Sequence, residues 1–391
     1  MVSDDARAIR ILHIVGAMNF GGIETWLIHV LRHIDRQRFS MDFFVEFAAQ
    51  CPDEAEIRAL GSRIIRGAGA HGVLRPWWYV RNLNGILHEH GPYDVVHSHV
   101  HHASGYVLRL ARQAGVPVRI AHSHIETTPL QATAGPVRCR YTALMTRWIA
   151  RQATLGLATS GKAAAELFGP TWHDDARWRI HLCGLHFEPF TEQVDRSAVR
   201  SELGFPPDAF VVGHVGRFEP QKNHTFLVDI VSQAARRDPR VRLLLVGDGP
   251  LRPAIEQQLA KVGLADRTVL VGRRRDVPRL MLGAMDALLF PSLFEGLGLV
   301  LIEAQAAGLP CLLSSDIPEE ADVVKPLIHR RSLSDSAVSW AEAILNIREA
   351  GSQIAQPEAL ALITQSAFNI RTAVRELETL YRTCVQRAAR C

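Results

Sequence analysis

The chain has 391 residues, of which 47% are hydrophobic and 21% charged, with a formal net charge of +4. This length allows two or three domains, and the small basic excess argues against both a nucleic-acid-binding protein and an acidic disordered chain. We therefore expect a compact soluble protein with no nucleic-acid partner.

The sequence shows neither an export signal nor a membrane span. Its polar start, VSDDARA, lacks the order of charged, apolar and small residues that defines a signal peptide. No stretch reaches the roughly 18 apolar residues that a membrane span needs. Six cysteines lie without paired spacing, as in a reducing compartment. We expect a cytoplasmic protein, with any contact to the inner face of the plasma membrane being peripheral.

Strands and helices alternate through the first half of the chain. Apolar runs predict strands, and helical periodicity predicts helices between them. In chain order these are Ile9–Val15, the helix Glu24–Ile34, Met41–Glu46, the helix Trp77–His90, Val95–His99, the helix Ala103–Ala114 and Val118–His122. This alternation predicts a parallel sheet covered on both faces.

The second half repeats this rhythm. The predicted elements are Phe210–Val215, the helix His224–Arg237, Val241–Val246, the helix Leu251–Val262, Thr268–Val271, a helix from Val277, Ala287–Phe290, the helix Leu299–Ala307 and Cys311–Ser315. We expect an α/β protein of two doubly wound Rossmann-like domains that face a central cleft, over residues 1–195 and 196–366. Residues 367–391 are expected to form a terminal helix that returns to the first domain.

The most specific motif is a pair of glutamates eight residues apart after a strand. Glu295 falls in the loop after the strand, and Glu303 lies about one turn into the next helix, which Gly298 and Leu299 open. The N-terminus of that helix offers free backbone N–H groups to a diphosphate. A carboxylate can accept two hydroxyl hydrogen bonds, which suits a ribose diol or a sugar ring.

Two further loops follow strands and carry groups suited to a phosphate. Arg217 and Lys222 can hold a diphosphate from two sides, and Lys222 is informative because the chain has only four lysines. After the first strand, Gly21 and Gly22 let backbone N–H groups approach a phosphate. Their spacing differs from that of a dinucleotide-binding loop.

Histidines are concentrated between His88 and His124. Alternation along the strand places His122 and His124 on one side near its carboxyl end, facing the expected cleft. Metal binding is the alternative interpretation. His99, His101 and His102 have no cysteine or carboxylate at ligand spacing, so no metal site is predicted.

The motifs together resemble a retaining glycosyltransferase of the GT-B fold, family 4, in the branch of exopolysaccharide and capsular polysaccharide transferases. The segments that carry the resemblance span nearly the whole chain: LHIVGAMNFGGIET, DVVHSH, RIAHSH, VGRFEPQKNH, RRRDVPRLMLGAMDALLFPSLFEGLGLVLIEAQAAGLPCLLSSDIP and SDSAVSWAEAIL. The resemblance implies sugar transfer from a UDP- or GDP-sugar to a hydroxyl of a glycan or lipid-diphosphate-linked acceptor, with retention of anomeric configuration. It implies no cofactor and no divalent metal.

The resemblance also implies roles for single residues. Arg217 and Lys222 would bind the donor diphosphate, Gly22 would contact it from the first domain, Glu303 would hold the ribose and Glu295 the transferred sugar. Arg273 matches the family's base-contacting turn. His124, with His122 second, would stabilise or orient the reacting groups.

Two other functions are compatible with the sequence, and the role of one arginine-rich segment has two interpretations. A GT-B-fold sugar-nucleotide epimerase or a non-catalytic sugar-nucleotide-binding subunit could share the same donor motifs. Four arginines interleaved with apolar residues could meet anionic lipid head groups, or they could form a solvated helix face. These arginines are Arg138, Arg140, Arg147 and Arg151.

Overall fold

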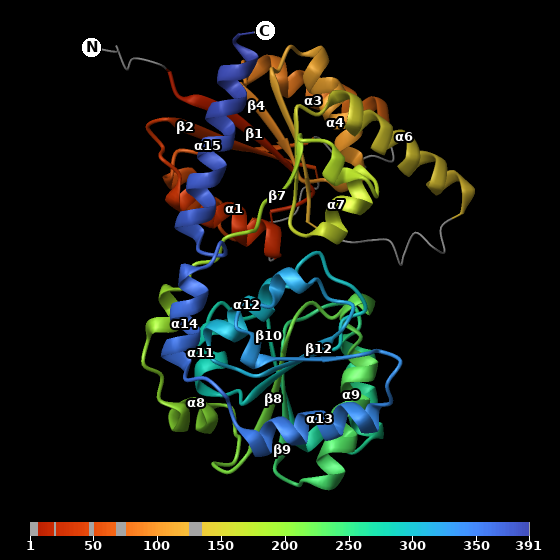
Figure 1. Ribbon diagram of the computed structural model, residues 1–391, viewed down its shortest axis with the longest axis vertical. Helices are drawn as coiled ribbons and strands as arrows, with labels where there is room; N and C mark the ends of the chain where they lie inside the picture. The colour runs from red at the N-terminus through yellow and green to blue at the C-terminus, as the bar shows by residue number, and fades with distance from the viewer. Residues whose placement is uncertain (1–6, 19–20, 47–50, 68–75, 125–134, 391) are drawn as a thin grey trace. The chain divides into compact units, whose positions relative to one another are not determined.

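A computed structural model gives the architecture of the protein and describes residues 7–18, 21–46, 51–67, 76–124 and 135–390. Contacts divide the chain into two compact units. Unit 1 comprises Met1–Leu185 with Ile370–Cys391, and unit 2 comprises His186–Asn369. Figure 1 follows the chain through both units by colour.

Unit 1 is built on a seven-stranded sheet in the order β3-β2-β1-β4-β5-β6-β7, and every neighbouring pair is parallel. Its strands are β1 (Ile9–Val15), β2 (Phe39–Val45), β3 (Ile64–Arg66), β4 (Val95–Ser98), β5 (Val118–Ser123), β6 (Leu155–Ala158) and β7 (Trp178–Ile180). Its helices are α1 (Gly22–His33), α2 (Glu54–Ala59), α3 (Pro76–Glu89), α4 (Ser104–Gln113), α6 (Pro136–Gln152), α7 (Gly161–Phe168) and α15 (Ile370–Ala388).

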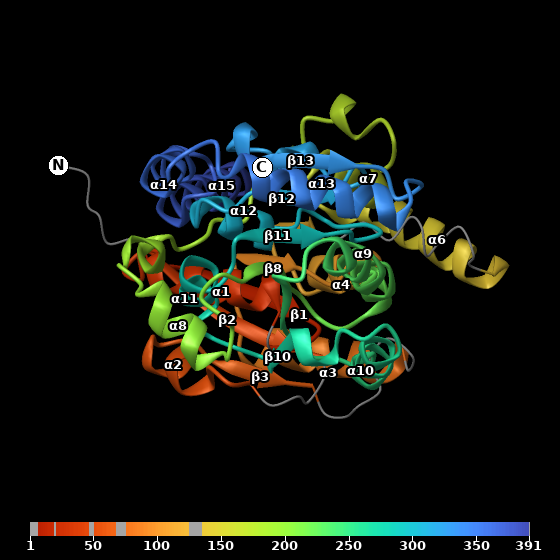
Figure 2. The ribbon, with the colours of Figure 1, turned by 90° about the horizontal axis from the view of Figure 1, so that it is seen from below.

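Unit 2 repeats this plan with six parallel strands in the order β10-β9-β8-β11-β12-β13. Viewed from below, Figure 2 shows β13, β12, β11 and β8 side by side. The strands are β8 (Phe210–Val215), β9 (Val241–Val246), β10 (Thr268–Gly272), β11 (Ala287–Phe290), β12 (Cys311–Ser314) and β13 (Ile328–Arg331). The helices are α8 (Arg196–Glu202), α9 (His224–Arg237), α10 (Arg252–Lys261), α11 (Val277–Gly283), α12 (Leu299–Ala306), α13 (Ala337–Ala350) and α14 (Gln356–Gln365).

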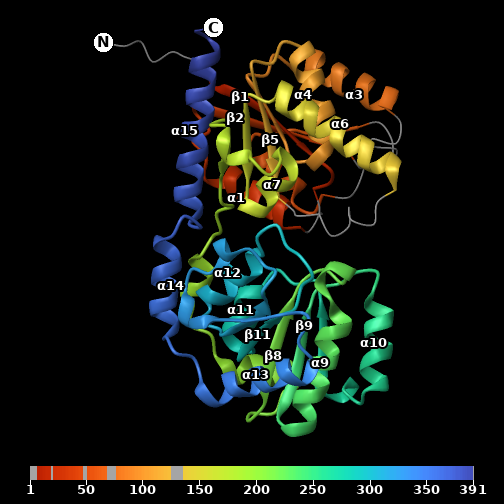
Figure 3. The ribbon, with the colours of Figure 1, turned by 45° about the vertical axis from the view of Figure 1, so that its right-hand side comes forward.

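Helices cover both faces of each sheet, which explains why the central strands are continuous apolar runs. In unit 2, α9, α10 and α13 lie on one side of the sheet and α11, α12 and α14 on the other, as Figures 2 and 3 show together. The sequence of β9 is VRLLLV, and five of its six residues are buried. A strand buried on both faces has no polar side, so its apolar residues follow one another without alternation.

The predicted fold class is confirmed, and the strands and helices predicted in the described residues lie close to their expected bounds. The strands β1, β8, β9 and β11 have the predicted limits. The edge strands β3, β7 and β13 and the inner strand β6 were not predicted. β3 and β7 have only three residues, β13 reads IHRR and β6 reads LGLA, so none of them gives the uninterrupted apolar run of four residues that marks β11.

The chain passes from one unit to the other at Leu185/His186 and at Asn369/Ile370. The segment that follows Leu185 belongs to unit 2 because Phe190 is buried there and its carbonyl accepts a hydrogen bond from Gln356 Nε2 at 3.0 Å. The predicted division at 195/196 therefore lies later along the chain than the structural one.

The terminal helix α15 returns to unit 1, as predicted. It packs against α1, and its fully buried Tyr381 contacts β4, where the Tyr381 hydroxyl lies 2.7 Å from His97 Nδ1. Among the helices that the structure describes, none is long and apolar enough to span a membrane.

Candidate active site

The candidate site in unit 2 forms where the strand order of the sheet reverses. Strands β8 and β11 are neighbours, yet the chain leaves them toward opposite sides, to β9 and to β12. Loops at the carboxyl ends of two such strands separate and leave a crevice in which open α/β sheets bind ligands. The loop 216–223 follows β8 and the loop 291–298 follows β11, so this reversal brings the two most specific motifs together.

The central contact between these loops is an ion pair. Lys222 Nζ lies 2.5 Å from Glu295 Oε1, and the two side chains are only 15% and 8% exposed. The ammonium also lies 4.9 Å from the centre of the Phe290 ring, in cation–π geometry. Sequence analysis assigned Lys222 to the diphosphate and Glu295 to the sugar as separate groups, whereas the structure joins them directly.

Two neighbouring residues hold this pair in place. Gln221 Nε2 donates to Glu295 Oε2 at 3.2 Å and to the Phe294 carbonyl at 2.9 Å. Asn223 begins α9 in the left-handed conformation at φ 54°, and its Nδ2 donates to the Pro291 carbonyl at 3.2 Å. Sequence reasoning missed both residues. The asparagine at position 223 could have been recognised in the sequence, because asparagine adopts a positive φ more readily than most residues and so suits a tight turn before a helix.

Arg217 lies on the same loop but is more exposed. Its Nη1 is 3.2 Å from Glu219 Oε1, and the two side chains are 46% and 36% exposed. A surface pair of this kind contributes little to stability. Its guanidinium can therefore exchange Glu219 for an anionic ligand at small cost.

The glycine-rich turn before α12 adopts the expected geometry. Gly298 caps the helix at φ 87°, a region that favours glycine, and Leu299 is the first helical residue. The first N–H groups of α12 have no partners within the helix and can point at an anion.

Glu303 follows one turn into α12 and is perturbed by burial. Desolvation raises the pKa of its carboxyl to about 7, and no charged side chain of the described residues offsets this effect. The ionised form is therefore held at a cost that hydroxyl donors would relieve.

Arg273 follows β10, which lies two strands away from β8 in the sheet. Gly272 before it has φ 68°, and its carbonyl accepts from the Gly247 N–H at 2.8 Å. Gly247 lies in the loop after β9, and a Cβ there would come 1.9 Å from the Gly216 carbonyl oxygen. Sequence analysis passed over this G-D-G turn, although its two glycines are a usual sign of close backbone approach.

The remaining predicted residues lie in unit 1. Gly21 precedes α1 in an extended conformation, and Gly22 is the first residue of that helix. His122 lies in β5 and His124 directly after it. Their side chains lie on the same side of the strand, as predicted, with ring centres 3.9 Å apart. Burial lowers the pKa of His124 to about 3 and that of His122 well below its usual value, so both imidazoles are neutral at pH 7.

Sequence spacing predicted no carboxylate near His101 and His102, and the structure shows that this prediction is wrong. Glu166 on α7 lies far from them in sequence, yet its Oε1 is 3.7 Å from His101 Nε2 and 3.9 Å from His102 Nε2. Sequence analysis also missed that the histidines extend to β1. His13, His97 and His99 lie together there, as described below.

Two family profiles match the chain. The profile of glycosyltransferase family 4 matches residues 20–180, and that of the glycosyl transferases group 1 matches residues 209–349. The chain is 34% identical over 346 residues to EpsF of Bacillus subtilis (strain 168), which is named as a glycosyltransferase, with 88% of each protein covered. It is 32% identical over 360 residues to the D-inositol 3-phosphate glycosyltransferase of Actinosynnema mirum, with 85% of each covered.

Solved structures share the fold. Anabaena HepE in complex with UDP-glucose superposes with a TM-score of 0.78 at 22% identity, covering 96% of this chain and all of that one. Sucrose-phosphate synthase from Thermosynechococcus elongatus superposes with a TM-score of 0.79, also at 22% identity, covering 96% of this chain and 98% of that one.

Fold and site therefore define a glycosyltransferase of the GT-B class. Within that class, the matches along both halves of the sequence show that the chain belongs to glycosyltransferase family 4.

The raised pKa of Glu303 gives a test of its environment. We expect Glu303→Gln to increase the free energy of unfolding at pH 8 by about 3 kcal/mol and to change it little at pH 4. Between the ordinary pKa of 4.5 and about 7, the unfolded wild-type chain ionises while the folded chain keeps its proton, so the wild type loses stability as pH rises. Urea unfolding at several pH values measures this difference.

Glu349→Gln is the matched control, because Glu349 is exposed in the last turn of α13. It should change stability by less than about 0.5 kcal/mol at every pH. A Glu303→Gln effect that is independent of pH, or that equals the control, would contradict the assigned environment.

Proposed function

We propose that this protein transfers a sugar from a UDP- or GDP-sugar to a hydroxyl of a glycan or lipid-linked acceptor, with retention of anomeric configuration, in polysaccharide biosynthesis. The observation that carries the proposal is the buried Lys222–Glu295 pair at the strand reversal of unit 2. This pair places a cation for the diphosphate beside a carboxylate for the sugar.

The pair would work by exchange of partners. When the donor binds, Lys222 turns from Glu295 to the diphosphate, and Glu295 is released to accept hydrogen bonds from hydroxyls of the sugar. Lys222 is then paired with the diphosphate charge and Glu295 with hydroxyl donors, so neither buried charge is left without a partner. Arg217 and the N-terminus of α12, opened by Gly298 and Leu299, add positive potential to the diphosphate.

We assign binding of the nucleoside to other residues of unit 2. Glu303 accepts hydrogen bonds from both ribose hydroxyls, and backbone around Arg273 contacts the base. The cations and the helix end neutralise the diphosphate, so we expect donor binding to need no divalent metal and no cofactor.

In the transfer step, the bond between the anomeric carbon and the diphosphate oxygen breaks, and a bond to the acceptor oxygen forms on the same face. The acceptor proton passes to an oxygen of the departing diphosphate. Lys222 and Arg217 stabilise the charge that develops there. We assign His124, with His122 as the second candidate, to orient the reacting groups as a neutral imidazole, and Gly21 and Gly22 to contact the diphosphate.

The comparisons indicate which donor to test first. HepE, which shares the fold, has been crystallised with UDP and with UDP-glucose, so UDP-glucose is a suitable first probe. EpsF and the D-inositol 3-phosphate enzyme support glycosyl transfer as the reaction class.

Two neutral substitutions should separate the roles of the paired side chains. We expect Lys222→Gln to weaken UDP binding by about 10- to 100-fold, because it removes a charged contact to the diphosphate. Glu295→Gln should bind UDP at least as tightly as wild type, since the competing carboxylate is gone, yet lose sugar transfer. Calorimetry measures binding, and UDP release with an acceptor measures transfer.

Lys261→Gln, an exposed lysine at the end of α10, is the control and should change neither quantity. The double variant Lys222→Gln/Glu295→Gln leaves no unpaired charge and should fold, yet transfer no sugar. Equal UDP affinity in the wild type and in the three variants at positions 222 and 295 would contradict the assignment. Release of a free epimerised sugar would favour an epimerase, and donor binding with neither hydrolysis nor transfer would favour a non-catalytic subunit.

We further propose that α6 makes a peripheral contact with anionic lipid on the cytoplasmic face of the membrane. Val137, Tyr141 and Leu144 follow one another at helical spacing and are 81%, 40% and 44% exposed. The arginines Arg138, Arg140, Arg147 and Arg151 are all exposed on the same helix. Such a combination of apolar and basic groups suits the surface of an anionic bilayer.

A lipid test follows from this surface. We expect the protein to co-sediment with vesicles containing phosphatidylglycerol at low salt and to be released as salt increases, because the attraction is electrostatic. Arg138→Glu/Arg140→Glu should abolish binding. Arg236→Glu/Arg237→Glu, a charge-matched change at the end of α9, should not. Equal sedimentation with neutral vesicles, or no effect of the α6 substitutions, would refute the proposal.

A further inference from the structure

Three histidines of unit 1 converge at the position where its own strand order reverses. His13 on β1 and His97 on β4 are direct partners in the parallel register of these neighbouring strands. His99 follows two residues after His97 and so lies on the same side of the sheet. The His99 N–H donates to the Ile14 carbonyl at 2.9 Å, which fixes its backbone to β1.

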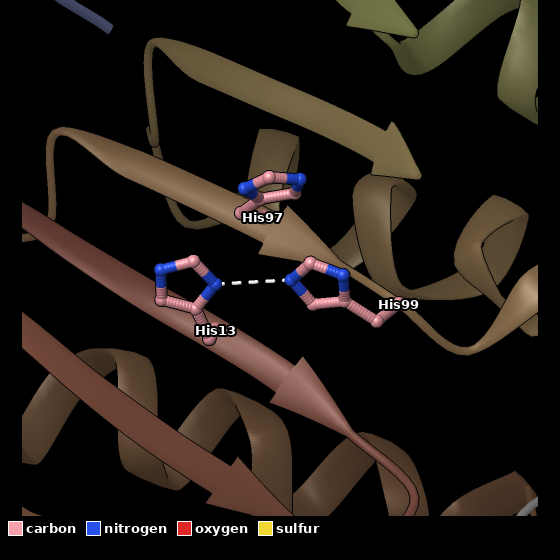
Figure 4. Close-up of side chains that lie close together, drawn as sticks. All are labelled: His13, His97 and His99. Atoms are coloured by element: carbon pink, nitrogen blue, oxygen red, sulfur yellow. Dashed lines mark hydrogen bonds between the residues drawn. The ribbon is translucent and has the colours of Figure 1, made fainter. Parts of the chain in front are cut away.

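The three side chains point toward one another (Figure 4). His13 Nδ1 and His99 Nε2 are 3.0 Å apart, and one ring nitrogen of each of the three lies within 4.8 Å of the others. His13 and His97 are fully buried, and His99 is 7% exposed. Their geometry is therefore set by the sheet, and His99 marks the side that solvent reaches.

We propose that His13, His97 and His99 form a binding site for a transition-metal ion that prefers imidazole ligands, with zinc as the representative ion. Three histidines leave a fourth coordination position open to a solvent molecule or an anion. Magnesium and calcium are poor candidates, because these hard cations require oxygen ligands.

Imidazole suits a metal ion at this position, because its neutral ring is the form that binds metals. Each neutral ring carries one N–H and one lone pair, so three rings can coordinate without releasing a proton. A proton shared between His13 and His99 can move to His13 Nε2, a buried atom that has no hydrogen-bond partner among the described residues.

Groups that would orient two of the ligands are already present. Metal-bound histidines usually donate their second N–H to an acceptor, which fixes the ring and raises its basicity. His99 Nδ1 lies 2.8 Å from His124 Nε2, and His97 Nδ1 lies 2.7 Å from the Tyr381 hydroxyl. The site shares no residue with Arg217 and Lys222, the cations proposed to bind the diphosphate, so metal-independent donor binding is compatible with it.

The test uses the full-length protein with any affinity tag removed. After treatment with a chelator, we expect the wild type to take up one equivalent of zinc, with an increase in Tm that grows with zinc concentration. Cobalt should give the intense visible absorption of a four-coordinate site, and zinc should displace it. Magnesium should do neither.

Substitutions locate the site. His13→Gln and His99→Gln keep groups that can form hydrogen bonds and should each lose at least 90% of the cobalt absorption while circular dichroism shows a folded protein. His214→Gln removes a buried histidine of unit 2 and should keep the full signal. Absence of cobalt absorption in the wild type would overturn the proposal. A double variant His13→Gln/His99→Gln that absorbs as strongly as the wild type would also overturn it. That result is expected if the metal binds at His101, His102 and Glu166 instead.

Discussion

The ion pair between Lys222 and Glu295 depends on one constraint of the fold, namely that β8 and β11 are neighbours although the chain places 71 residues between Val215 and Ala287. Because the chain departs from these strands in opposite directions, the loops at their carboxyl ends separate and leave a crevice between them. A lysine and a glutamate can meet there, shielded by Phe290 and oriented by Gln221. Removing either partner would leave a buried charge without compensation. A ligand that offers a new partner to each side chain can therefore separate Lys222 from Glu295.

The same constraint operates in unit 1, where β1 and β4 meet at the reversal of a second parallel sheet. Here the fold gathers neutral imidazoles rather than opposite charges. His13 and His97 are register partners, and His122 joins them from β5 through a 3.1 Å contact to His97. The terminal helix closes this group through Tyr381. One architecture therefore supplies two sites of different chemistry, according to which side chains end the central strands.

Features that depend on neighbouring residues in the sequence could be predicted from the sequence alone. Buried parallel strands produce apolar runs, so β1, β8, β9 and β11 could be predicted to the residue, whereas three-residue edge strands could not. The motifs around Lys222 and Glu295 led to the prediction of a cation for the diphosphate and a carboxylate for the sugar, and these roles stay predictions. Their direct contact could not be predicted, because it joins loops 73 residues apart. The proximity of Glu166 to His101 and His102, and of His13 to His97, depends on tertiary packing in the same way.

A structure of the enzyme with a bound UDP-sugar would test the exchange of partners most directly. The account predicts the β-phosphate within about 3 Å of Lys222 Nζ, as in a charge-assisted hydrogen bond, with Glu295 turned to the hydroxyls of the sugar. Glu303 should accept from both ribose hydroxyls. A donor bound elsewhere while Lys222 and Glu295 remain paired would contradict the central claim.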